Sequence, residues 1–164
     1  GQTINACLKD FTTMALVVTI SPEHLDNGDQ VLLKESLAHY DLNSVDSLVI
    51  RTLPNSPNKL TRRYSGTNPA YLSPDFTALL ATHNIKHLIV DLPSVDREED
   101  GGLLKAHHAF WQYPENPRMS STITELAYIT DEVADGHYLL QIQIAAFESD
   151  ASPSKPILYP LTKI

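Results

Sequence analysis

The stretch SPDFTALLATHNIKHLIVD, residues 73–91, decides the fold class of this 164-residue chain. Ser73 can cap a helix and Pro74 suits the first helical position, so a helix is predicted over residues 73–84. Asn84 fits the end of that helix, and the apolar segment that follows is typical of a buried strand. The stretch therefore predicts a helix that leads directly into a strand.

Strands are predicted on both sides of this helix, in MALVVTI (14–20) and DSLVIRTL (46–53) before it and in HLIVD (87–91) after it. Strand, helix and strand in that order indicate a crossover unit with parallel strands. Residues 54–74 are rich in Pro, Asn and Ser, which predicts a long loop. Loops of that length are uncommon in compact domains unless they are functional or mobile.

The remaining patterns add a helix and an antiparallel part. VLLKESLAHY (31–40) carries apolar residues at helical spacing, so a helix is predicted there. TITELAYI (122–129) and HYLLQIQIAAF (137–147) predict strands, and PILYPL (156–161) is expected to close the sheet. The predicted fold class is α/β, with a mixed sheet, crossover helices and an antiparallel C-terminal part, in a single domain over residues 1–164.

Composition excludes several classes of partner. The net charge of −8 argues against non-specific binding to nucleic acid, whose affinity comes mainly from Lys and Arg on phosphates. No apolar run approaches the ~20 residues that cross a bilayer, so no membrane partner is expected. The one cysteine, Cys7, rules out a thiolate-rich zinc site and suits a reducing compartment, so a cytoplasmic location is expected.

Two acidic residues follow the strand predicted at 87–91, in the segment DLPSVD. Ligands tend to bind at strand ends in open α/β sheets, and Asp91 and Asp96 lie at or just past such an end. Ser94 could hydrogen-bond locally within the turn. An ordinary turn with exposed acids explains the same residues, and both interpretations stay open.

Histidines and a carboxylate suggest two possible metal sites. His83 and His87 are four residues apart, but the helix ends between them, so polar surface residues are the preferred interpretation there. His107, in KAHHAFW, and Glu125, in the middle of an apolar strand pattern, could share one Zn or Mn ion. The alternative is that Glu125 lies on the solvent-exposed face and the histidines are polar helix positions.

The order of these motifs resembles the cyclase-family metal-dependent hydrolases, which include bacterial kynurenine formamidase. The resemblance covers most of the chain and rests on five motifs: Asp91-Leu92-Pro93-Ser94-Val95-Asp96, His107-His108, Glu125, Asp135-Gly136-His137-Tyr138 and Asp150-Ala151-Ser152-Pro153.

Two features of the family pattern differ in this chain. The N-terminal His-Gly-x-x-His-x-(Asp/Glu) motif, which supplies the other metal ligands and the usual general base, has no match. The chain is therefore expected to be the larger, C-terminal part of a longer cyclase-family protein, and no catalytic residue is assigned in it. Residues 112–121, QYPENPRMSS, also separate His107 from Glu125 by more positions than in the formamidases and are interpreted as a loop insertion.

The resemblance implies a role for each site residue. His107 is implied as the metal ligand with Glu125 as its partner, while Ser94 and Asp96 shape the loop beside the metal. His108 is expected to point elsewhere, into the pocket or the core, because adjacent helical residues are rotated by about 100°.

The implied function is a metal-dependent hydrolase of amide- or formamide-type C–N bonds, with Zn or Mn, a small-molecule substrate and a homo-oligomeric assembly. Because its metal site is expected to be incomplete, the isolated chain should bind the metal weakly and show little or no activity. The alternatives are a non-catalytic relative that serves as a binding or assembly module, and a helix-packed structural subunit.

Overall fold

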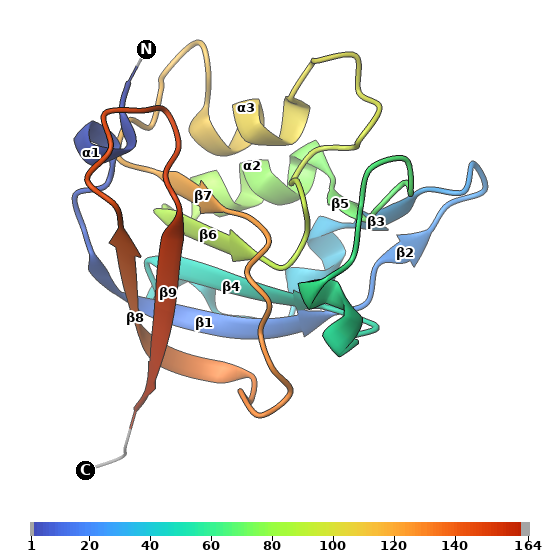
Figure 1. The fold of residues 1–164 in the computed structure, drawn as a ribbon, viewed down its shortest axis with the longest axis horizontal. Helices are drawn as coiled ribbons and strands as arrows, with labels where there is room; N and C mark the ends of the chain where they lie inside the picture. The colour runs from blue at the N-terminus through green and yellow to red at the C-terminus, as the bar shows by residue number, and fades with distance from the viewer. Residues whose placement is uncertain (1, 162–164) are drawn as a thin grey trace.

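A computed structural model describes residues 2–161 and shows a six-stranded mixed sheet in the order β7-β6-β4-β1-β8-β9 (Figure 1). The strands are β1 Thr12–Ile20, β4 Ser47–Thr52, β6 His87–Val90, β7 Thr122–Thr124, β8 Gly136–Ile144 and β9 Ser154–Pro160. The first four are mutually parallel, whereas β8 pairs antiparallel with β1 and β9 pairs antiparallel with β8. The predicted mixed α/β fold with an antiparallel C-terminal part is confirmed.

The crossover unit forms as the sequence predicts. Helix α2, Pro74–Thr82, connects β4 to the parallel strand β6. The hydroxyl of Ser73 accepts a hydrogen bond from the Phe76 N–H, so Ser73 is the N-cap. Asn84 has φ 57°, a left-handed conformation that Asn tolerates better than most residues and that ends the helix.

The helix predicted over residues 31–40 is wrong. Val31 and Leu32 lie in the short strand β3, where they pair with β5, and only Lys34–Leu37 forms a 3₁₀ helix, η1. The apolar spacing is misleading because Leu32 and Leu37 reach the same core from two different elements. The small second sheet contains β2 Glu23–His24, β3 Gln30–Leu32 and β5 Tyr71–Leu72.

The other helices are short. They are α1 Ile4–Cys7, η2 Leu42–Ser44, η3 Pro57–Leu60 and α3 Lys105–Trp111, so the loop predicted over 54–74 contains η3 and the strand β5. Of the helices within residues 2–161, none combines the length and the apolar character that crossing a membrane would require.

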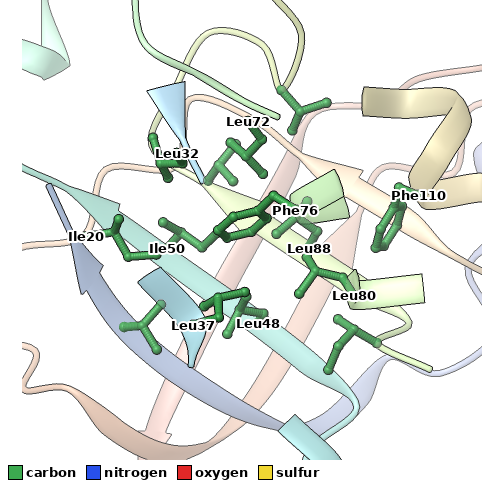
Figure 2. Close-up of a cluster of buried hydrophobic side chains, with 14 of the residues drawn as sticks. Ile20, Leu32, Leu37, Leu48, Ile50, Leu72, Phe76, Leu80, Leu88 and Phe110 are labelled. Carbon is green, nitrogen blue, oxygen red and sulfur yellow. The ribbon is translucent and has the colours of Figure 1, made fainter. Parts of the chain in front are cut away.

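Apolar side chains cover both faces of the parallel strands. On one face, Phe76 of α2 and Phe110 of α3 pack with Leu48 and Leu88 of the sheet in the main core (Figure 2). On the other face, a smaller cluster contains Leu8, Ala15, Val17, Val49, Ile89, Ile129, Leu140 and Ile142. Burial on both faces explains why these strands show continuous apolar runs rather than alternation.

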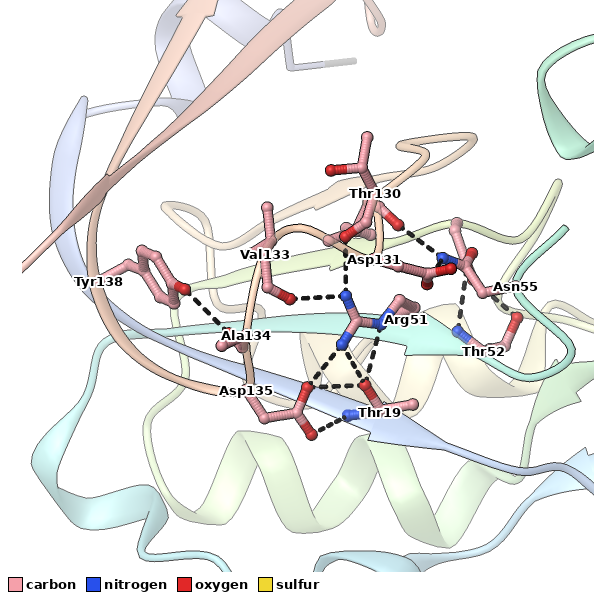
Figure 3. Close-up of polar contacts among 12 residues, drawn as sticks. Thr19, Arg51, Thr52, Asn55, Thr130, Asp131, Val133, Ala134, Asp135 and Tyr138 are labelled. Atoms are coloured by element: carbon pink, nitrogen blue, oxygen red, sulfur yellow. Dashed lines mark hydrogen bonds and ion pairs between the residues drawn. The ribbon is translucent and has the colours of Figure 1, made fainter. Parts of the chain in front are cut away.

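Arg51 fixes the chain where it returns from β7 to β8. Its guanidinium donates to the carbonyls of Thr130 (2.8 Å) and Val133 (2.7 Å) and to the carboxylate of Asp135 (3.0 Å), as Figure 3 shows. The same carboxylate accepts the backbone N–H of Thr19 in β1. Asp135, which the sequence marks as part of a family motif, therefore holds the sheet to this loop.

Candidate metal centre

Asp96 positions His107. Its carboxylate accepts the backbone N–H of Ala106 (2.6 Å) at the start of α3, and the other oxygen lies 2.6 Å from His107 Nδ1. Because a carboxylate only accepts hydrogen bonds, Nδ1 carries a proton and donates it, and in the neutral imidazole this leaves the lone pair on Nε2. This carboxylate–imidazole pairing is the arrangement that orients metal-ligating histidines in proteins.

The backbone turn formed by the DLPSVD segment fixes the position of Asp96. The Ser94 hydroxyl accepts the backbone N–H of Asp96 at 3.1 Å, and Asp96 is 7% exposed. The backbone N–H of Val95 points the other way and donates to Glu125 Oε1 at 3.0 Å. One turn therefore holds both the residue that orients His107 and the carboxylate opposite it.

Glu125 lies just after β7, not in the middle of a strand as its pattern predicts. The strand ends at Thr124, and Leu126 has φ 57° and donates its backbone N–H to the Leu92 carbonyl. Burial raises the pKa of Glu125, while the Val95 N–H and His107 act in the opposite direction and Asp96 raises it further. A half-buried carboxylate of this kind is stabilised by a cation.

His107 and Glu125 converge. Nε2 of the histidine lies 3.5 Å from Oε1 of the glutamate. Two ligands about 2.1 Å from a tetrahedral Zn²⁺ are roughly 3.4 Å apart, so the separation suits a shared cation. Within residues 2–161, however, no group of three or more His, Cys, Asp or Glu side chains is placed so that it could hold one metal ion. The described residues thus fit a divalent metal with two ligands and one orienting carboxylate.

His108 lies apart from these residues. Its ring packs against that of Tyr113 with 5.1 Å between the centroids and a tilt of 48°, and it lines a separate hollow with Gln112 and Asn116. The structure therefore brings Ser94, Asp96, His107 and Glu125 together but leaves His108 out.

The other histidine pair does not converge either. His83 Nδ1 contacts Asn43, whereas His87 Nδ1 lies 2.8 Å from the Thr122 hydroxyl. His87 is 1% exposed, so its predicted position on the surface is wrong. It is the first residue of β6, and its side chain faces the neighbouring strand.

A cavity of about 580 Å³ opens beside His107 and Glu125. Both residues lie in its wall, together with Asp150 and Ser152 of the fifth sequence motif. The rest of the wall is largely apolar and comes from the first residues of the chain, from α3 and the segment after it, and from β7 and β8. It includes Ile4, Leu8, Trp111, Met119, Ile123, Ile142 and Ile144. Concave, mainly apolar cavities with a few polar groups are typical of small-molecule sites.

Sequence reasoning missed a buried ion pair. The Asp91 carboxylate is fully buried and accepts the backbone N–H and hydroxyl of Thr52, and the Lys59 ammonium lies 2.7 Å from it. Asp91 is therefore engaged within the protein at the carboxyl end of β6. No local pattern links it to Lys59, which lies in the Pro- and Asn-rich loop 32 residues earlier.

Comparisons with known proteins agree on one family. The family model described as "Putative cyclase" matches residues 1–97. The chain is 30% identical over 129 residues to a kynurenine formamidase of Bacillus cereus, a match that covers 78% of this chain and 56% of that protein. It is 31% identical over 134 residues to a kynurenine formamidase of Bacillus cytotoxicus, a match that covers 81% of this chain and 58% of that protein. The chain thus spans little more than half the length of these curated relatives.

Solved structures share the fold. One is a potential metal-dependent hydrolase with cyclase activity, with a TM-score of 0.67, 18% identity, and coverage of 92% of this chain and 66% of that one. Another is an isatin hydrolase bound to the product analogue thioisatinate, with a TM-score of 0.60 and 13% identity. That match covers 93% of this chain and 60% of the isatin hydrolase chain. At these identities the likeness concerns the arrangement of the backbone.

Proposed function

Because the chain belongs to the Cyclase family, we propose that it forms the larger part of a metal-dependent hydrolase that cleaves amide- or formamide-type C–N bonds. The observation that carries this proposal is the 3.5 Å approach of His107 Nε2 to Glu125 Oε1, with Nδ1 of the same ring held by Asp96. The kynurenine formamidases that resemble the chain suggest the formamide bond.

In this proposal, His107 and Glu125 would hold a Zn or Mn ion. A divalent cation supplies Lewis-acid chemistry, polarising a carbonyl oxygen and making water a better nucleophile. Asp96 keeps the imidazole proton on Nδ1, so that Nε2 faces the site as a lone pair. The Val95 N–H holds Glu125 beside it, and the apolar cavity receives the organic part of a small-molecule substrate.

The proposal also includes the oligomeric state of the protein. We infer a homo-oligomer, as the family resemblance implies, with the remaining metal ligands supplied from outside the described residues. The second candidate function, a non-catalytic binding module, is favoured by the convergence of only two donors within residues 2–161.

Zinc binding tests the metal centre. Isothermal titration calorimetry with Zn²⁺ is expected to show binding weaker than micromolar, because two ligands alone hold a cation loosely. His107→Ala and Glu125→Gln should abolish it, whereas His108→Ala should not, since its ring stacks on Tyr113 elsewhere. Sub-micromolar binding would contradict the two-ligand site, and identical heats for the wild type and His107→Ala would refute it altogether.

Hydrolysis separates the two candidate functions. N-Formylaniline incubated with the chain and excess Zn²⁺ or Mn²⁺ should release aniline slowly, and His107→Ala should lower the rate to the background of metal alone. Equal release by the wild type and by this variant would show that the chain alone does not hydrolyse the amide, and it would favour the binding module.

Asp96 is expected to tune the metal affinity. In Asp96→Asn, an amide N–H facing Nδ1 would move the imidazole proton to Nε2, so Zn²⁺ affinity should fall by about 10- to 100-fold. Ser94→Ala is the matched control, because it removes one hydrogen bond from the turn and leaves the carboxylate. Unchanged affinity in a folded Asp96→Asn protein, checked by circular dichroism, would rule out the positioning role.

A further inference from the structure

Arg118 places a positive charge in the wall of the cavity beside the metal centre. One terminal nitrogen of the guanidinium donates to the Phe110 carbonyl at 2.9 Å and the other to the Ile85 carbonyl at 2.7 Å. Its central carbon lies 5.2 Å from the centroid of the Phe110 ring. These contacts fix the guanidinium against α3 and the loop before β6, and partial burial lowers the pKa of Arg118.

The charge of Arg118 has no acidic counterpart in the part of the chain that the structure describes. The two other half-buried or buried arginines have acidic partners, since Arg51 pairs with Asp135 and Arg97 with Asp29, both at 3.0 Å. Across residues 2–161, no carboxylate lies within ion-pair distance of Arg118. A guanidinium has five N–H groups, and neutral carbonyls accept from only two of its nitrogens here.

The rest of the cavity wall limits what this charge can bind. Apart from Arg118, the charged side chains and histidines in the wall are His107, Glu125 and Asp150, and the first two form the proposed metal centre. The surfaces between them are apolar, with the indole of Trp111 and the side chains of Met119 and Ile123. A partly desolvated guanidinium surrounded by such surfaces favours a carboxylate attached to an apolar body.

We infer that Arg118 is a specificity-determining residue that selects substrates carrying a carboxylate on an apolar, ring-containing body. The inference rests on the proposed function, in that the same cavity receives the substrate whose C–N bond is cleaved. The anionic end is held by Arg118, and the apolar body fills the space towards His107 and Glu125.

The intrinsic fluorescence of Trp111 reports directly on this cavity, because it is the one tryptophan of the sequence and lines the wall. The probes are 3-phenylpropanoate and its neutral amide, titrated at pH 8 with EDTA so that no metal ion attracts the carboxylate. The wild type is expected to bind the acid at least about tenfold more tightly than the amide, as one charge-assisted hydrogen-bonded pair provides.

Variants at Arg118 test the source of this preference. Arg118→Gln should bind the acid and the amide equally, and Arg118→Lys should keep part of the preference. Arg62→Gln is the matched control, because Arg62 is an exposed arginine that lies over Tyr64 and outside this cavity. Circular dichroism confirms that each variant is folded.

Comparing the affinities of the wild type for the acid and for the amide tests the inference even without a variant. Equal affinity for acid and amide, no binding of either at millimolar concentration, or a preference that persists in folded Arg118→Gln would each overturn the inference. Because the titration contains no metal and measures no turnover, its failure is distinguishable from failure of the proposed hydrolysis.

Discussion

Replacing Lys59 with Met is expected to lower the free energy of unfolding by about 3–5 kcal/mol, the cost of leaving a buried charge without its partner. The Asp91 carboxylate is fully buried and the Lys59 side chain is 12% exposed. Methionine keeps the length and packing of the lysine stem but removes the ammonium 2.7 Å from that carboxylate. Urea unfolding monitored by circular dichroism measures the change.

A double variant separates the charge from the packing. Lys59→Met combined with Asp91→Asn should recover much of the loss, because no uncompensated charge then remains buried. Lys34→Met, which removes a surface pair with Asp75 at 3.9 Å, should cost at most about 1 kcal/mol. A loss below about 1 kcal/mol in Lys59→Met itself would show that water reaches Asp91.

Elements with local signals could be predicted from the sequence. The cap at Ser73, Pro74 at the first helical position and the left-handed Asn84 all lie within one short stretch, and the structure has the helix between them. The prediction over residues 31–40 failed because pairing of Val31 and Leu32 with β5 overrides helical spacing.

The candidate site likewise combines features with a local sequence signal and features that depend on long-range contacts. Chemistry alone left His107 and Glu125 as one of two open interpretations, and the family resemblance favoured their pairing. Their 3.5 Å approach depends on the Val95 N–H that holds Glu125, a contact between residues 30 positions apart. The positions of Lys59 and Arg118 could not be predicted, because each depends on a partner more than 30 positions away, the Asp91 carboxylate or the Ile85 carbonyl.

His87 should make the protein less stable as the pH falls from about 6.5 to 4. Burial lowers the pKa of His87 from 6.5 to about 4, and its Nε2 is buried without a hydrogen-bond partner in the described part of the chain. Between these values the unfolded chain binds a proton that the folded protein does not, so stability falls with pH. A shift of this size is worth about 3 kcal/mol, and the loss is complete only below the folded pKa.

His87→Asn removes the titration and keeps a polar atom near the position of Nδ1, where the Thr122 hydroxyl lies at 2.8 Å. Urea unfolding between pH 7 and 5, above the range in which most carboxylates titrate, should show the wild type losing up to about 1.4 kcal/mol per pH unit below pH 6.5. The asparagine variant should be nearly flat over that interval, and the exposed-site control His39→Asn should follow the wild type. Equal slopes for the wild type and His87→Asn would mean that the buried imidazole accepts its proton without opening the junction of β6 and β7, and the assignment of His87 as a neutral core residue would then be wrong.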